Sequence, residues 1–366
     1  VQRLVKEGKA VVAFGAGEPD FDTPEPIKAA AIKAIQDGFT KYTPTSGIPE
    51  LKDAICKKLK TDNDLDYTPS SVVVSCGAKH SLYNALQVLV DDGDEVLIPV
   101  PFWVSYPEMV KLAGGRPVFV QTSLADGLKV NPLSLKKHIS KRTKALILNS
   151  PSNPCGVVYR RDELKAIADF CVENGLYCIS DEIYEKIIFD NIEHVSIASL
   201  TDAIKKLTIT VNGFSKSYSM TGWRLGYLAA TPEVTSAVSN LQDHSTSNPN
   251  SITQRAALAA FSLGEPYFDE IKKKFQDRRD YIISRLDGMK QLGYYKPEGA
   301  FYIFCNIKKT GLDSFTFAKR LLEEKFVAVI PGAPFGCDDY VRISFATSME
   351  NIKKGFDRIE EWLAKI

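Results

Sequence analysis

Between residues 70 and 230, short β-rich runs alternate with segments of helical periodicity, and this alternation constrains the fold more than any other feature of the sequence. It is typical of a mostly parallel sheet with helices on both faces. Runs such as VLIPV and ALILN are apolar at successive positions, as strands buried on both faces require. The sequence therefore predicts an α/β fold around a seven-stranded sheet. The expected strands are 71–75, 95–100, 116–120, 144–149, 176–180, 207–211 and 225–230, and the expected helices are 24–37, 79–90, 104–113 and 162–173.

A different pattern follows Pro249. A long charged helical stretch runs from about Glu265 to Leu292, AFYIFCNI and VAVI are the next expected strands, and a helix follows at 349–364. This order predicts a second, smaller α+β domain. The opening residues are too few to form a domain alone, so we expect them to pack against this C-terminal part. The predicted division is a large domain of residues 22–265 and a small domain of residues 1–21 and 266–366.

Charge and composition narrow the functions that this chain can have. Its 46 Lys and Arg residues balance 45 Asp and Glu residues, so no net field draws it to nucleic acid or to an anionic membrane. No apolar run reaches the roughly 18 residues of a spanning helix, and the first residues lack the apolar stretch of a signal peptide. We expect a soluble, cytoplasmic protein. The seven cysteines form no CxxC pair and the four histidines suggest no catalytic pair, so we expect no metal site.

Polar residues follow several of the predicted strands at the point where each strand ends. Ligands of open α/β sheets bind at these carboxyl ends. After the first strand, Gly77-Ala78 opens a helix whose unpaired N–H groups favour a phosphate. Asp181 and Tyr184 follow one later strand, and Lys216 follows the next. Taken singly, these residues have ordinary explanations: a tight turn, a helix cap, a buried aromatic and a solvated lysine.

Together, the same residues match the needs of one cofactor. An imine needs a lysine, a pyridinium nitrogen needs an acid, a ring oxygen needs a phenol, and a phosphate needs a cradle of N–H groups. No other common cofactor needs this set. The sequence therefore predicts a site for pyridoxal 5'-phosphate, held as a Schiff base on Lys216.

Six motifs in order carry a resemblance to a known family. They are GAGEPDFDTP at 15–24, KYTPTSGIPELK at 41–52, SPSNPCG at 150–156, SDEIYE at 180–185, SKSYSMTGWRLGY at 215–227 and VRISFA at 341–346. Over nearly its whole length, the chain resembles the fold-type I pyridoxal-phosphate enzymes, specifically class I aminotransferases of the bacterial aspartate aminotransferase type. The resemblance implies transfer of the amino group of aspartate to 2-oxoglutarate by a ping-pong mechanism, through a lysine aldimine and pyridoxamine phosphate.

The resemblance also implies roles around the cofactor. Lys216 is expected to form the aldimine and to move the substrate proton, while Asp181 keeps the ring nitrogen protonated. Tyr184 and Asn153 are expected to hydrogen-bond the ring oxygen, and Trp103 to stack on the ring. The expected phosphate ligands are Gly77, Ala78, Ser215, Arg224 and, from the neighbouring subunit of a homodimer with shared active sites, Tyr42.

For the amino-acid and 2-oxo-acid substrates, the resemblance implies two cations. Arg342 matches the residue that grips the α-carboxylate, assisted by Asn153, Trp103 and the backbone of Gly17. Lys79 resembles the lysine that reaches the second carboxylate of a dicarboxylic substrate. Each cation also has a plain alternative, a strand arginine in a surface ion pair and a solvated lysine in the first turn of a helix.

Several functions stay open at this point. Prephenate, alanine, aromatic and kynurenine aminotransferases share most of these motifs, and a C–S lyase uses the same fold and the same imine. A lyase would release ammonia and pyruvate without an oxo-acid acceptor. A transcription regulator of aminotransferase shape would need a DNA-binding helix-turn-helix, which we do not expect here. In the family, residues before GAGEPD also line the substrate side, so the amino donor stays open.

Overall fold

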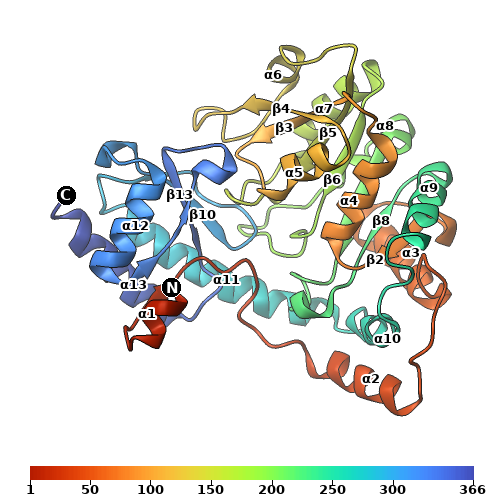
Figure 1. The fold of residues 1–366 in the computed structure, drawn as a ribbon, viewed down its shortest axis with the longest axis horizontal. Coiled ribbons are helices and arrows are strands. Elements are labelled where there is room, and N and C mark those ends of the chain that lie inside the picture. The colour runs from red at the N-terminus through yellow and green to blue at the C-terminus, as the bar shows by residue number, and fades with distance from the viewer.

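A seven-stranded sheet forms the centre of the computed structural model, which describes residues 1–366 (Figure 1). Its strand order is β2-β8-β7-β6-β5-β3-β4, and every pairing is parallel except those that β8 makes with β2 and β7. The expected α/β fold with a mostly parallel sheet is confirmed. The strands are β2 (Val72–Ser75), β3 (Glu95–Val100), β4 (Arg116–Gln121), β5 (Thr143–Asn149), β6 (Tyr177–Asp181), β7 (Thr208–Gly213) and β8 (Gly226–Ala229).

Helices cover both faces of this sheet, which explains why its strands are apolar at successive positions. In β5, Ala145 and Ile147 pack into the cluster that contains the side chains of α4 and α9. The alternate residues Leu146 and Leu148 pack into the cluster that contains those of α7. The helices around the sheet are α2 (Glu25–Gln36), α3 (Pro49–Asn63), α4 (Ala78–Leu89), α5 (Ser105–Leu112), α6 (Pro132–Lys136), α7 (Arg161–Glu173), α8 (Asp202–Leu207), α9 (Pro232–Asp243) and α10 (Ser251–Ala260).

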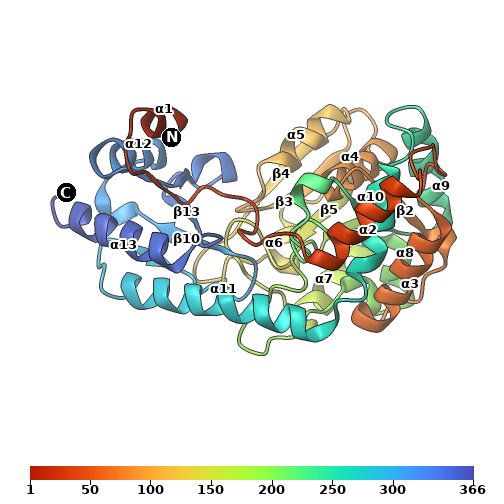
Figure 2. The same ribbon diagram turned by 90° about the horizontal axis from the view of Figure 1, so that it is seen from below.

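The second part of the fold is a smaller α+β assembly. Its antiparallel sheet has the order β12-β13-β10-β9, and α11 extends along the lower side of the molecule beneath both parts (Figure 2). The elements are α11 (Gly264–Leu286), β9 (Gly293–Tyr294), β10 (Tyr302–Asn306), α12 (Ser314–Lys325), β11 (Val327–Ala328), β12 (Ile330–Pro331), β13 (Tyr340–Ser344) and α13 (Met349–Leu363).

The opening residues join this smaller assembly. After α1 (Gln2–Lys6), strand β1 (Val12–Ala13) pairs in parallel with β11, and the ring of Phe14 packs 5.9 Å from that of Phe356 in α13. Both views accordingly show the N-terminus beside α12 (Figures 1 and 2). The N-terminal segment therefore lies against the C-terminal part, while the domain limits at residues 22 and 265 stay a prediction.

The two parts meet at the turn that follows β6. Ile183, Tyr184 and Ile187 come directly after β6 but belong to the apolar core of the smaller assembly. The carboxyl end of the large sheet is thereby held against β10 and β13. Among all helices of the structure, none combines the length and the apolar character that crossing a membrane requires.

Candidate active site

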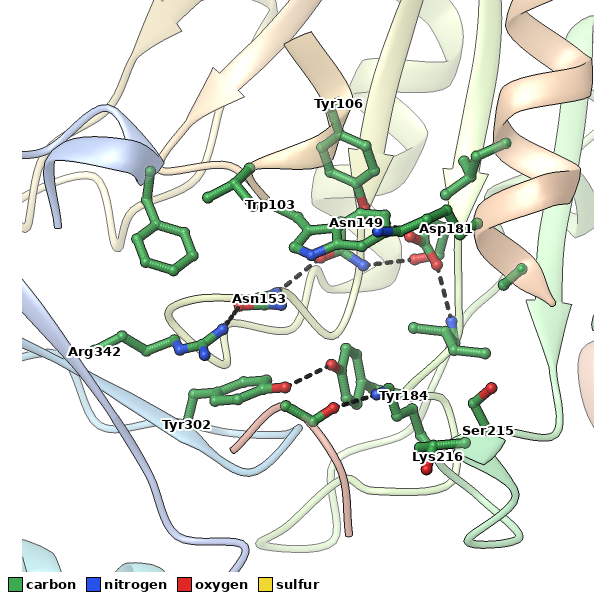
Figure 3. A pocket seen from close by; sticks show the side chains of 18 of the residues that line it. Trp103, Tyr106, Asn149, Asn153, Asp181, Tyr184, Ser215, Lys216, Tyr302 and Arg342 are labelled. Carbon is green, nitrogen blue, oxygen red and sulfur yellow. Dashed lines mark hydrogen bonds between the residues drawn. The ribbon is translucent and has the colours of Figure 1, made fainter. Parts of the chain in front are cut away.

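A cavity of about 650 Å³ lies where the carboxyl ends of the large sheet meet the smaller assembly (Figure 3). The residues that line it lie at or after the carboxyl ends of β2, β3, β5, β6 and β7, in the N-terminal segment, and in the smaller assembly around β10, β12 and β13. Of the residues predicted for the site, all but Gly77 and Tyr42 line this one cavity: Gly17, Ala78, Lys79, Trp103, Asn153, Asp181, Tyr184, Ser215, Lys216, Arg224 and Arg342. The structure thus brings together residues that are more than 300 positions apart in the sequence.

Asp181, the last residue of β6, presents a buried carboxylate to the cavity. The hydroxyl of Tyr106 donates to its Oδ2 at 2.7 Å, and the backbone N–H of Ile183 donates to its Oδ1 at 3.3 Å. Burial raises the pKa of Asp181 to about 6, although the hydrogen bond from Tyr106 acts against this shift. The carboxylate forms no salt bridge, so a cation placed beside it would offset the cost of burying its charge.

Lys216 follows β7 and extends its amino group into the same cavity. Its Nζ donates to the backbone carbonyl of Gly17 and lies 6.0 Å from the centre of the Tyr184 ring. Burial lowers the pKa of Lys216 to about 8, an effect that Glu18 opposes and Arg224 strengthens. Because only the uncharged amine is a nucleophile, this lysine is better suited to form an imine near neutral pH than a solvated one.

Two tyrosine hydroxyls meet beside Lys216. The Oη atoms of Tyr184 and Tyr302 are 2.9 Å apart, and both rings are buried. Burial raises the pKa of both phenols, so both keep their protons near neutral pH. Because one hydroxyl donates to the other, one proton of the pair is left to donate to an oxygen in the cavity.

Arg342 reaches the opposite side of the cavity from β13. Its Nη1 donates to Oδ1 of Asn153 at 2.9 Å and its Nη2 donates to the carbonyl of Gly15 at 3.2 Å, while its buried Nε has no partner. The guanidinium lies 4.4 Å from the centre of the Tyr302 ring. An arginine that is fixed in this way and still has a free buried donor is suited to bind a carboxylate.

The start of α4 forms a cradle for an anion. Gly77 has φ +95°, and a Cβ at this position would lie 2.5 Å from Nη2 of Arg224. Glycine is favoured because side chains rarely adopt this backbone conformation, and any side chain here would also displace the guanidinium. The unpaired N–H groups that begin at Ala78, together with Ser215 and Arg224 on the cavity wall, suit a phosphate.

Comparison with known proteins places this site in a family. The sequence model of the family described as aminotransferase class I and II matches residues 9–359. The chain belongs to this family. It is 45% identical to an aspartate aminotransferase of Bacillus subtilis over all of this chain and 94% of that protein. It is also 45% identical to an aspartate/prephenate aminotransferase of Cereibacter sphaeroides, over 99% of this chain and 94% of the relative.

A solved structure supports the same assignment. The aspartate aminotransferase from Thermus thermophilus with maleate superposes with a TM-score of 0.95 at 41% identity, over 98% of this chain and 94% of the other. The protein is thus an aminotransferase that depends on pyridoxal phosphate, and its substrates are amino acids and 2-oxo acids.

The residues of the cavity fit pyridoxal phosphate. Asp181 is a buried carboxylate without a cation, which a protonated pyridine nitrogen supplies. The backbone at Gly77 leaves the space of a missing side chain beside Arg224, where a phosphate can approach N–H groups. Lys216 has the lowered pKa that imine formation needs. The cofactor predicted from the sequence is confirmed by the family, while the role of each residue stays a proposal.

Two predicted residues lie differently from the rest. Gly77 does not line the cavity, and its backbone lies close to the guanidinium of Arg224 at the start of α4. Tyr42 is 92% exposed and does not line the cavity either. Within a single chain, therefore, Tyr42 is not part of the site.

Sequence reasoning missed four polar residues of the cavity: Tyr106, Asn149, Thr221 and Tyr302. Asn149 ends β5, and its Oδ1 accepts from the N–H of Asn153 at 2.8 Å. Its place at a strand end was a usable signal. Tyr106 and Tyr302 lie inside a helix and a strand, where a tyrosine reads as an ordinary core residue.

A second polar cluster lies beside the turn that follows β6. Ligand atoms of Glu182, Glu185 and His194 lie within 4.8 Å of one another, a spacing that a metal ion could use. However, Glu182 already accepts from two serine hydroxyls and contacts His194 at 3.0 Å, and Glu185 is paired with Lys58. Burial favours protonation of Glu185, but Lys58 and His194 outweigh it and hold the pKa at about 2. We assign this cluster a structural role in fixing the turn between Asp181 and Tyr184.

Proposed function

We propose that this aminotransferase exchanges the amino group between aspartate and 2-oxoglutarate. Both compounds are dicarboxylates, and the observation that carries the proposal is a second cation, Lys79, on the wall of the cavity that also contains Arg342. The names of the relatives support this choice. Maleate, present in the related Thermus structure, is a dicarboxylate as well.

Arg342 is the residue that we assign to the α-carboxylate, which every amino-acid substrate has. Its two Nη groups are held by Asn153 and Gly15, so its orientation is fixed before the substrate arrives. Its free Nε donor then meets a carboxylate at little cost in side-chain entropy.

Lys79 is assigned to the distal carboxylate. The residue is in the first turn of α4, and its Nζ lies 4.8 Å from the centre of the Trp103 ring. The side chain is exposed, so its ammonium remains hydrated and mobile until an anion binds. A dicarboxylate would connect Lys79 to Arg342 across the cavity.

The remaining side chains act on the cofactor and on the proton. When bound, pyridoxal phosphate supplies an electron sink for the carbanion at the substrate Cα. Asp181 holds the ring nitrogen protonated, Tyr184 and Asn153 hydrogen-bond the ring oxygen, and Trp103 covers the ring. Gly77, Ala78, Ser215 and Arg224 hold the phosphate. Lys216 moves the proton that leaves Cα, a task for which its pKa of about 8 is suited.

A homodimer with shared active sites is part of the proposal. Tyr42 is 92% exposed, and Ile32 and Ile35 of α2 are 54% and 56% exposed. An exposed aromatic residue and two exposed isoleucines support contact with a second copy, in which Tyr42 would reach the phosphate of the neighbouring site. The cytoplasmic location likewise stays a proposal from the sequence.

A panel of amino donors and oxo-acid acceptors tests the substrate assignment. With 2-oxoglutarate as acceptor, aspartate is expected to give a higher kcat/KM than alanine or an aromatic amino acid. With aspartate as donor, 2-oxoglutarate is expected to give a higher kcat/KM than prephenate. A higher value for prephenate, alanine or an aromatic donor would reassign the substrate. Release of pyruvate and ammonia without an acceptor would instead indicate a C–S lyase.

Lys79→Ala is expected to impair the reaction of aspartate selectively. Loss of a charge partner for the distal carboxylate should lower kcat/KM by roughly 2–4 kcal/mol in transition-state terms. Alanine should react almost as before, because it presents only the α-carboxylate that Arg342 binds. Steady-state kinetics with both donors provide the measurement.

Lys111→Ala is the matched control, since Lys111 is an exposed helix lysine paired with Glu108 outside the cavity. Lys111→Ala should leave kcat/KM unchanged for both aspartate and alanine. An equal loss for aspartate and alanine in Lys79→Ala would mean general damage to the site, and no loss for either would mean that Lys79 is only solvated.

A further inference from the structure

We propose that Tyr302 is a positioning residue that donates a hydrogen bond to Tyr184 and thereby sets how strongly Tyr184 donates to the cofactor's ring oxygen. This inference rests on the proposed role of Tyr184. Nothing in the sequence singles out Tyr302, which lies within the apolar strand β10. The proposal comes instead from the way in which the two phenols meet (Figure 3).

The geometry of the pair is specific. The two hydroxyl oxygens are 2.9 Å apart, and Tyr184 is the only hydrogen-bond partner of the Tyr302 hydroxyl. The rings are nearly perpendicular, at 85°, so they contact each other at the edge while the hydroxyls point at each other. The Tyr302 side chain is 0% exposed, so no solvent can replace this partner.

The number of protons fixes the direction of the bond. Each phenol carries one proton and therefore donates one hydrogen bond. If Tyr184 gives its proton to the ring oxygen, it can only accept from Tyr302. The two bonds then form a chain in which the first strengthens the second, because an oxygen that accepts a hydrogen bond becomes a better donor.

The ring and the hydroxyl of Tyr302 have separate tasks. The ring supports the guanidinium of Arg342 at 4.4 Å, on the side where the α-carboxylate binds. The hydroxyl lies next to the N-terminal segment, since a Cβ on Gly17 would be 3.7 Å from it. Replacing only the hydroxyl therefore tests the positioning role without removing the support for Arg342.

Tyr302→Phe is the decisive variant, and the readout is the pH titration of the visible absorption of the Lys216-bound cofactor. With a weaker donor at Tyr184, more negative charge stays on the ring oxygen, which holds the proton on the Lys216 nitrogen more tightly. The titration midpoint should rise by about 0.1–0.5 pH unit, because the lost hydrogen bond acts on the ring oxygen only through Tyr184 and contributes a fraction of one hydrogen bond. KM for aspartate should stay within about twofold, because the ring beneath Arg342 remains.

The control and the double variant make the interpretation unambiguous. Tyr294 belongs to the neighbouring strand β9, and its hydroxyl donates to Asp287 outside the cavity, so Tyr294→Phe should leave the midpoint unchanged. In a Tyr184→Phe background, Tyr302→Phe should add no further shift, because its effect passes through Tyr184.

Each alternative result has a distinct meaning. An unchanged midpoint in Tyr302→Phe, or an equal shift in both backgrounds, would overturn the positioning role of Tyr302. A Tyr184→Phe variant that does not move the midpoint would instead contradict the proposed role of Tyr184 itself. The failure of the inference and the failure of the proposed function are thus distinguishable.

Discussion

Lys216→Ala should lower the rate of transamination by about 10⁴-fold or more, because the variant loses both the covalent attachment point and the general base. No other side chain can substitute for it. Lys79 is the only other lysine on the cavity wall, and its Nζ lies over Trp103 rather than beside Tyr184. Steady-state kinetics with aspartate and 2-oxoglutarate provide the measurement.

Borohydride reduction of the holoenzyme gives a direct second readout. Peptide mapping should find the reduced cofactor on Lys216. The pH dependence of cofactor attachment has a defined sign: the rate should rise up to about pH 8, the pKa of Lys216, because the charged form that dominates below it is no nucleophile.

Lys52 provides the matched control for this experiment. Burial lowers its pKa as well, but its Nζ donates to Ser46 and it lies outside the cavity. Lys52→Ala should retain cofactor binding and turnover. Label recovered on a lysine other than Lys216, or substantial activity in Lys216→Ala, would end the assignment.

The large sheet could be predicted from the sequence because its strands are buried on both faces. In β5, for example, each residue from Ala145 to Leu148 faces an apolar layer, so the run stands out against the polar segments around it. The antiparallel direction of β8 could not be predicted, since an apolar run has no direction. The direction of β8 depends on the path of the chain between the end of β7 and Gly226, where β8 begins.

Helix α9, which has a low intrinsic helix propensity, was missed for a related reason. The sequence of α9, PEVTSAVSNLQD, is rich in β-branched and small polar residues, which favour a helix less than leucine or alanine does. It is helical because Val234 and Val238 pack on the sheet and Gln242 bonds backbone and side chains near β2. Such tertiary contacts decide the structure of a weakly helical segment, and they cannot be read from the segment alone.

The residues of the site likewise fall into those that could be predicted from the sequence and those that could not. Asp181, Tyr184 and Lys216 could be predicted because strand ends place them at one edge of the sheet. Tyr302 reaches the cavity only because β10 pairs with β13 in a register that sets Tyr302 opposite Ser344 and Phe304 opposite Arg342. That register and the meeting of the two parts of the fold have no local signature. The place of Tyr302 at the cavity therefore could not be predicted from its local sequence.

Asp181→Ala is expected to leave the cofactor bound but to lower kcat by about 10²–10⁴-fold. Loss of one partner of a buried charge pair corresponds to about 3–5 kcal/mol, and here it falls on the state in which the ring accepts the electrons of the carbanion. Binding should persist because the phosphate cradle around Gly77 and Arg224 is intact. Kinetics together with a cofactor titration separate the two effects.

Tyr106→Phe is the control that separates the charge of Asp181 from its hydrogen bond. It keeps the carboxylate but removes the hydroxyl that donates to it at 2.7 Å. This hydrogen bond holds the pKa of Asp181 down against the effect of burial, so its loss raises that pKa further above the ordinary value. Protonation of Asp181 would then weaken its hold on the ring nitrogen as the pH falls, so the acid limb of the kcat profile should move to higher pH while the rate on the plateau stays close to normal.

In Asp181→Ala the plateau itself should fall, because no pH restores a missing carboxylate. Near-normal turnover by Asp181→Ala would mean that the ring nitrogen is held elsewhere, and weak cofactor binding with normal turnover at saturation would mean that Asp181 anchors the cofactor without activating it.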